Sequence, residues 1–216
     1  MRKVVYLWRK FHGMKKFIIS LLVLAIIAFG VYWFLARPED TTEKKEPVPL
    51  AIANKSDAFQ AAFASLMVSY YSMKDAFVNW DTAAANKAAL DLQIKAHGLP
   101  MDEMKADSGI VQTARDFSES IVAEAKGIVG ENNIEQKRRS FYTLSEHLYN
   151  LVRTVRYSGE VVYHHQCPMA FNDNEEAYWL SNSSEVVNPY LGTSHPKYKA
   201  GMLHCGELKD SIDYRK

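Results

Sequence analysis

Residues 56–80, SDAFQAAFASLMVSYYSMKDAFVNW, contain the clearest helical pattern in the chain. Seven large apolar residues recur at alternating intervals of four and three positions: Phe59, Phe63, Leu66, Tyr70, Met73, Phe77 and Trp80. This spacing stacks the seven side chains on one face of an α-helix. Such a stripe is far more typical of core packing than of a cofactor or metal site, so we expect it to form the centre of a helical domain.

Two further helices are expected directly after this stretch. Asp81 or Thr82 is a suitable N-cap for a second, Ala-rich helix, which Gly98 should end. Apolar residues at helical spacing from Ile110 onward predict a third helix that stops at Gly130. The connections between these helices are short, which favours antiparallel neighbours.

A fourth helix is expected to begin near Asn132. Glu135 follows Asn132 by three residues, as in a capping box, and apolar residues then repeat at intervals of three and four up to Val155. The basic run 137–139 is expected to lie on a solvated face of this helix. We therefore predict a mainly α fold, with a four-helix up-and-down bundle over residues 56–157.

Helical periodicity is lost in the last part of the chain. Residues 158–216 contain both cysteines and four of the seven histidines, together with many Asn, Gly, Pro and aromatic residues. Residues 160–163 are expected to form a short strand or extended entry. The remainder of this tail is expected to be irregular and only partly extended.

Charge is distributed unevenly along the chain. The 216 residues contain 26 basic and 25 acidic side chains, but residues 1–16 carry six basic side chains and no acidic one. The remaining residues are therefore acidic overall, with a net charge of −5. The near-zero total gives no sign of a nucleic-acid partner.

An uncharged stretch of twenty residues, FIISLLVLAIIAFGVYWFLA, covers residues 17–36. As a helix with a rise of about 1.5 Å per residue, it would span the roughly 30 Å hydrocarbon layer of a bilayer. Tyr32, Trp33 and Phe34 form an aromatic belt at its far edge. We expect an uncleaved transmembrane signal anchor, with cleavage after Ala36 as the alternative.

The charges around this stretch predict the topology of the chain. The basic residues of the tip 1–16 should stay in the cytoplasm, whether translation starts at Met1 or at Met14. Residues 37–55 are expected to form a linker, and residues 56–216 a periplasmic domain. The predicted location is the bacterial inner membrane, with a single pass and the C-terminal domain in the periplasm.

The tail carries two clusters of soft ligands. Each cluster offers a thiol, a thioether and imidazole within a few residues: His164, His165, Cys167 and Met169 in the first, and Met202, His204 and Cys205 in the second. Sulfur ligands select Cu(I), and Ag(I) behaves alike. Folding back the segment between the clusters would bring them together, so we expect a Cu(I) or Ag(I) site.

Other chemistry is compatible with the same cysteines. Two cysteines in an oxidising compartment are an even number, so a Cys167–Cys205 disulfide is a strong alternative. Zinc is less well matched, because neither a C-x-x-C nor an H-x-x-x-H spacing is present. Thiol catalysis by Cys167, with His164 or His165 as base, lacks a recognisable orienting acid or oxyanion device. We therefore predict no enzyme activity and no catalytic residue, and leave metal site and disulfide open.

Four short blocks in the tail resemble the signature of the family called domain of unknown function 3347. The blocks are CPMAF (167–171), AYWLS (177–181), NPYLG (188–192) and MLHCG (202–206), whereas the helical part is similar only in general character. The resemblance implies a periplasmic module without known enzyme activity, either anchored alone or fused to periplasmic adaptor subunits of copper/silver efflux pumps. The resemblance includes four of the candidate metal ligands, Cys167, Met169, Met202 and Cys205. It also implies a copper/silver efflux component as partner.

Overall fold

The computed structural model describes residues 24–33 and 54–215. The chain divides into two compact units, Met1–Val48 and Pro49–Lys216. In the first unit, residues 24–33 form a helix with exposed side chains. No helix within the described ranges is long and apolar enough to span a bilayer. The predicted basic tip and most of the predicted linker lie outside these ranges, as do the two ends of the predicted anchor, so the anchor stays a prediction.

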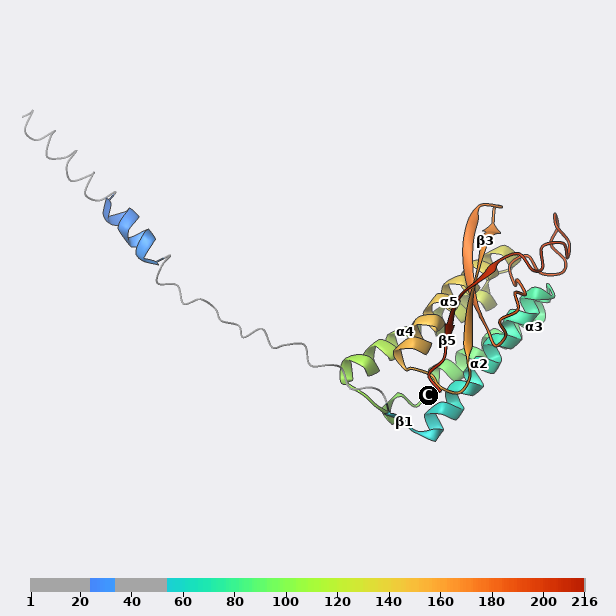
Figure 1. The fold of residues 1–216 in the computed structure, drawn as a ribbon, viewed down its shortest axis with the longest axis horizontal. Coiled ribbons are helices and arrows are strands. Elements are labelled where there is room, and N and C mark those ends of the chain that lie inside the picture. The colour runs from blue at the N-terminus through green and yellow to red at the C-terminus, as the bar shows by residue number, and fades with distance from the viewer. Residues whose placement is uncertain (1–23, 34–53, 216) are drawn as a thin grey trace, which may run out of the picture. The chain divides into compact units, whose positions relative to one another are not determined.

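Four long helices make up most of the second unit (Figure 1). They are α2 (Asp57–Val78), α3 (Thr82–His97), α4 (Ser108–Gly130) and α5 (Ile134–Thr154). Consecutive helices pack against one another. The connection from α3 to α4 contains a short 3-10 helix, η1 (Met101–Glu103), and β2 (Met104–Lys105), which pairs antiparallel with β1 (Asn54–Lys55). The prediction of a mainly helical fold is confirmed.

Polar side chains cap three of the four helices. The Ser56 hydroxyl accepts the Phe59 N–H at 3.1 Å, and the Asp81 carboxylate accepts the Ala84 N–H at 2.9 Å. The N-cap of α5 is Asn133, not the predicted Asn132, because the Asn133 side chain accepts the N–H groups at positions 135 and 136. The other helix ends agree with the sequence to within two residues.

The apolar stripe of α2 forms the centre of the core. Six of its seven predicted members are at most 1% exposed: Phe59, Phe63, Leu66, Tyr70, Met73 and Phe77. Phe141 of α5 closes the bundle from the opposite side, with ring centroids 5.5 Å from Tyr70 and 5.0 Å from Phe77. The seventh member, Trp80, lies beyond the end of α2 with a positive φ of 60°.

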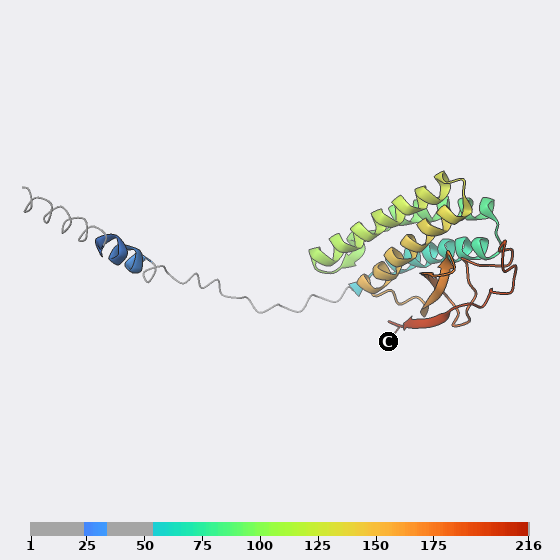
Figure 2. The ribbon, with the colours of Figure 1, turned by 90° about the horizontal axis from the view of Figure 1, so that it is seen from above.

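The tail is more regular than the sequence predicts. It forms a three-stranded antiparallel sheet in the order β4-β3-β5, from β3 (Val162–Phe171), β4 (Glu175–Ser181) and β5 (Glu207–Ile212). Figure 2 shows this sheet beside the helices. The predicted entry at 160–163 is the beginning of a ten-residue central strand. The prediction of an irregular tail is therefore wrong for β3, β4 and β5.

Both faces of β3 are covered, which explains why its sequence shows no polar alternation. His164 contacts Glu146 and Tyr149 of α5 on one face. On the other face lies the segment 182–206, which connects β4 to β5 and brings Cys205 to Cys167. A strand covered on both sides loses the polar–apolar alternation by which half-buried strands are recognised.

The basic run 137–139 does not lie on a solvated face. Lys137 and Arg138 are each 3% exposed, and only Arg139 reaches the surface. Lys137 Nζ donates to Asn86 Oδ1 at 2.8 Å and to the Ile128 carbonyl. Three consecutive helical positions cover more than half a turn, and α5 is packed on two sides, so at least one of them must point inward.

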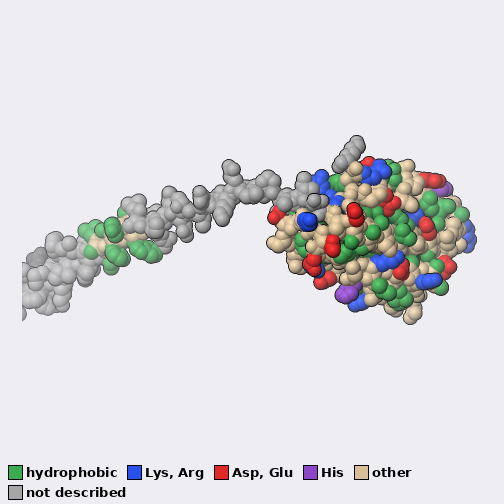
Figure 3. Space-filling model, turned by 90° about the horizontal axis from the view of Figure 1, so that it is seen from below, with side chains coloured by type: hydrophobic (Ala, Val, Ile, Leu, Met, Phe, Trp, Pro, Cys, Tyr) green, Lys and Arg blue, Asp and Glu red, His purple; other side chains and the backbone are tan. Residues whose placement is uncertain are grey.

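On the molecular face in Figure 3, acidic and basic side chains are interspersed.

Candidate functional site

The two cysteines lie next to each other. Cys167 Sγ and Cys205 Sγ are 3.8 Å apart, and both residues are free thiols. Cys167, in the middle of β3, is fully buried, whereas Cys205, just before β5, is partly exposed. The structure thus brings together one residue from each cluster that the sequence singled out.

Asn188 holds the segment that carries Cys205. Its side chain is fully buried, and its Nδ2 donates to the Cys205 carbonyl at 2.7 Å. Its Oδ1 accepts the N–H groups of Tyr190 at 2.8 Å and Leu191 at 3.0 Å, which builds a tight turn. The Asn188 N–H donates to the Leu203 carbonyl at 2.8 Å. One amide side chain therefore links the turn at 188–192 to the cysteine at 205.

Gly206 allows the chain to pass close over β3. Its φ of +137° is a conformation that L side chains rarely adopt, and an added Cβ would lie 2.5 Å from the Gln166 carbonyl oxygen. The same Cβ would lie 3.1 Å from the Trp179 ring. The glycine after Cys205 therefore sets how closely the second thiol approaches the first.

Burial raises the pKa of the Cys167 thiol to about 11, although the Met169 backbone N–H and the Asn188 side chain act in the opposite direction. The neighbouring Cys205 adds to the increase. At neutral pH Cys167 is therefore a protonated thiol, and a cation that binds it must displace a proton. Such a thiol is a poor nucleophile.

The distance between the sulfurs is compatible with two chemical outcomes. Two thiolates with bonds of about 2.3 Å to one ion are separated by about 3.8 Å in tetrahedral and about 4.6 Å in linear coordination, so the 3.8 Å between Cys167 and Cys205 suits a site that further ligands complete, and the sulfurs would have to move apart for a site of two ligands. A disulfide requires about 2.05 Å, so the sulfurs would have to approach by a little under 2 Å. The pair can thus hold a soft ion or close into a disulfide after a small side-chain movement.

The two adjacent histidines of β3 point to opposite faces of the strand. His164 is 3.1 Å from Glu146 Oε1 through Nε2, and its ring lies between Tyr149 and Tyr178, at centroid distances of 4.1 and 5.1 Å. His165 is fully buried on the other face, with Nε2 3.1 Å from the Ser183 carbonyl. The Nε2 atom of each imidazole thus has its own partner, whereas the buried Nδ1 of His165 has no hydrogen-bond partner among the described residues.

His204 is exposed, and its Nδ1 lies 2.7 Å from the Val186 carbonyl. Across the described ranges, no group of three or more His, Cys, Asp or Glu side chains is arranged to hold a metal ion. Any site at the cysteine pair must therefore use the two thiols, with or without thioether sulfur.

Both methionines of the predicted site are partly buried and pack against the core. The pairing of β3 with β4 is irregular between Cys167 and Phe171, where Pro168 cannot donate a backbone hydrogen bond. This irregularity removes the strict alternation that would place Met169 on the same side as Cys167. Met202 lies in the turn that precedes Cys205, whose N–H donates to the Met202 carbonyl at 3.0 Å.

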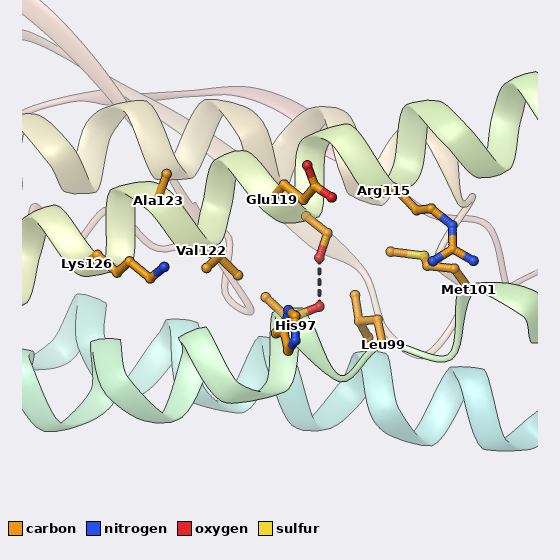
Figure 4. Close-up of a pocket in the computed structure, with 10 residues that line it drawn as sticks. His97, Leu99, Met101, Arg115, Glu119, Val122, Ala123 and Lys126 are labelled. Atoms are coloured by element: carbon orange, nitrogen blue, oxygen red, sulfur yellow. Dashed lines mark hydrogen bonds between the residues drawn. The ribbon is translucent and has the colours of Figure 1, made fainter.

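A hollow lies apart from the cysteine pair, between the end of α3 and α4 (Figure 4). It has a volume of about 560 Å³ and a mixed lining, with His97, Arg115 and Lys126 among its residues. The Ser118 hydroxyl beside it donates to the Ala96 carbonyl at 2.7 Å. It shares no lining residue with the cysteine pair.

The family described as Protein of unknown function (DUF3347) matches residues 66–159 of the chain. The resemblance inferred from the sequence is thus confirmed. The match covers most of α2 and all of α3, α4 and α5, and it ends before β3, whereas the four blocks on which we based the resemblance lie in the tail. No curated protein and no solved structure matches the chain.

Proposed function

We propose that the unit Pro49–Lys216 binds one Cu(I) or Ag(I) ion between Cys167 and Cys205. The observation that carries this proposal is the 3.8 Å between their sulfurs, in residues 38 positions apart in the chain. Soft monovalent ions prefer thiolate and thioether ligands. They therefore do not need the groups of three or more His, Cys, Asp or Glu side chains that bind harder metal ions. Met169 and Met202 are the thioethers nearest in sequence to the two cysteines.

The exposure of the two thiols suits capture and release. Cys205 is partly exposed and would meet an incoming ion first, while Cys167 is fully buried and would complete the site. Burial of a charge is unfavourable without a counter-charge; a monovalent cation offsets one of the two thiolate charges, and the partly exposed Cys205 leaves the remaining charge near water. An ion held by one accessible and one buried sulfur can be passed to a partner through the accessible one.

We further propose that residues 17–36 anchor this unit to the bacterial inner membrane, with the N-terminus in the cytoplasm and the unit in the periplasm. The support is the uncharged stretch of twenty residues and the six basic side chains before it. The family resemblance suggests a component of copper/silver efflux as the partner that receives the ion.

The test is a competition titration of the reduced full chain against a Cu(I) chelator of known affinity. We expect about one Cu(I) per chain, and loss of binding in Cys167→Ser and in Cys205→Ser. His204→Asn is the matched control, because His204 lies in the same segment but contacts only the Val186 carbonyl among its described partners. Undiminished binding by Cys167→Ser, or no binding by the reduced wild type, contradicts the proposal.

The affinity should also depend on pH in a defined direction. Because the Cys167 pKa is raised to about 11, the thiol must lose a proton whenever an ion binds below that pH. The apparent Cu(I) affinity should therefore rise at least about tenfold for each pH unit between pH 6 and 8. The titration is repeated across that range with correction for the chelator's own protonation, and a flat profile refutes a Cys167 ligand.

The alternative is a structural or interaction domain of the cell envelope that a Cys167–Cys205 disulfide stabilises. The same sulfur spacing favours it, and closure of a loop of this length would add about 4 kcal/mol of stability. Thiol titration of the native protein without reductant separates the two functions. Two free thiols exclude the disulfide. The disulfide is supported if the native protein has no free thiol and holds no metal.

A further inference from the structure

Arg138 of α5 is buried without an acidic partner. It is 3% exposed, its Nε donates to the Pro189 carbonyl at 3.0 Å, and its Nη2 donates to the Phe77 carbonyl at 2.9 Å. The guanidinium carbon lies 3.9 Å from the centroid of the Trp80 ring. Within residues 54–215, no carboxylate is placed in ion-pair contact with it.

The two carbonyls and the Trp80 ring compensate the guanidinium only in part, because none of them carries a full negative charge. A guanidinium has five N–H donors, and the bonds to the two carbonyls use two of them. Burial lowers the pKa of Arg138 to about 9, because the charged form loses its hydration in this position. A buried charge is normally matched by an opposite charge, so an anion is the missing partner.

A cavity of about 220 Å³ adjoins the guanidinium. Its wall is mixed: Phe171, Tyr190 and Pro196 contribute apolar and aromatic surface, whereas Asn133, Glu135, Asn172 and His195 contribute polar groups. Glu135 is the one acidic residue of this wall, and its Oε1 bonds Arg139 at 3.2 Å instead of Arg138. The cavity therefore offers one buried cation beside both apolar and polar groups.

The backbone beside the cavity contains two left-handed residues, of which Trp80 is strained, whereas Gly192 adopts this conformation without cost. Trp80 has a φ of 60°, which is costly for a bulky residue, and its Nε1 donates to the Leu191 carbonyl at 2.9 Å. Gly192 has a φ of 56°, and an added Cβ would lie 2.4 Å from the Val78 carbonyl oxygen. Strain of this kind persists where the surroundings fix it, and it is concentrated at ligand sites. Its result here is an indole ring fixed over the guanidinium.

We propose that this cavity binds a small organic monocarboxylate, whose oxygens accept hydrogen bonds from Arg138 and whose short apolar stem contacts Phe171 and Tyr190. The planar fork of a guanidinium matches a carboxylate. A phosphate dianion is less well matched, because Arg138 is the one cation facing the cavity. His195 also lines the cavity, but its own burial and the nearby charge of Arg138 lower its pKa, so its ring is neutral at pH 7. The volume equals that of about seven water molecules, which suits a stem of two to six carbons.

This site is independent of the cysteine pair, since neither cysteine lines the cavity. The test is equilibrium dialysis of the full chain, kept in a non-ionic detergent and a carboxylate-free buffer, against radiolabelled propionate. We expect saturable binding of about one propionate per chain, and a dissociation constant at least about tenfold higher in Arg138→Gln. Arg153→Gln is the matched control, because Arg153 is an exposed arginine of the same helix that does not line the cavity, and the dissociation constant of this variant should stay within about twofold of wild type.

A second variant covers the case in which Arg138→Gln does not fold, as judged by circular dichroism. Ala170→Val adds two methyl groups to the cavity wall without removing the charge and should also weaken propionate binding. Non-saturable binding by the wild type, or wild-type affinity in the folded Arg138→Gln or Ala170→Val variant, overturns the proposal. Stronger competition by inorganic phosphate than by acetate overturns the assignment to carboxylates.

Discussion

Replacing Asn188 with alanine should destabilise the folded unit by about 3 kcal/mol. The side chain is fully buried and takes part in three hydrogen bonds: to the Cys205 carbonyl at 2.7 Å, and from the N–H groups of Tyr190 and Leu191 at 2.8 and 3.0 Å. Alanine removes all three and leaves their partners inside the protein, where each unpaired group costs roughly 1 kcal/mol or more. The turn at 188–192 and the position of Cys205 should loosen together.

Urea unfolding followed by circular dichroism measures this loss, and alkylation of the native protein measures the loosening. Asn174→Ala is the matched control, because Asn174 is an exposed asparagine in the turn between β3 and β4. The free energy of unfolding of this variant should differ from wild type by less than about 0.5 kcal/mol. Cys167 should be alkylated faster in Asn188→Ala than in the control. A destabilisation below about 1 kcal/mol would show that the three bonds do not hold the segment, and would refute this reasoning.

Three further changes test the packing around the same sheet. Tyr70→Phe removes the hydroxyl that accepts the Leu180 N–H at 2.9 Å, and it should lower the free energy of unfolding by about 1 to 3 kcal/mol in urea titrations; no loss would mean that this bond contributes nothing. Gly192→Ala forces a Cβ to within 2.4 Å of the Val78 carbonyl oxygen at positive φ, so we expect a loss of about 2 to 4 kcal/mol and a lower Tm. Burial lowers the pKa of His165, so on acidification the unfolded state binds a proton more readily than the folded state, and the free energy of unfolding should rise with pH between about 5 and 7. His165→Gln should flatten this rise in urea titrations. An unchanged slope would contradict the buried, neutral ring.

The helices could be predicted from the sequence because their signals are local. The stripe of α2 repeats at helical spacing over seven residues, and Asp81 and Gly98 provide the chemistry that begins and ends α3. Trp80 was the exception, because a residue that continues the spacing need not continue the helix. Its positive φ is imposed by tertiary contacts with the segment around Leu191, which local periodicity does not contain.

The sheet and the candidate sites were harder to predict. β3 is covered on both faces, so its residues do not alternate between polar and apolar, and the tail was interpreted as irregular. The proximity of Cys167 to Cys205 could be anticipated as a pairing of two clusters. The separation of His164 from His165 could not, because it depends on assigning a strand in which neighbours point to opposite faces. The burial of Arg138 depends on what packs on both sides of α5, for which a basic run gives no signal.

The position of β5 at the edge of the sheet has a consequence for how this unit behaves at high concentration. Its outer side presents backbone groups to which a second copy could add a strand, and such edges are common starting points for aggregation. Glu207, Lys209 and Asp210 are exposed along this strand. These charged side chains of β5 would lose part of their hydration if another strand paired there, so they protect the fold against association through this edge.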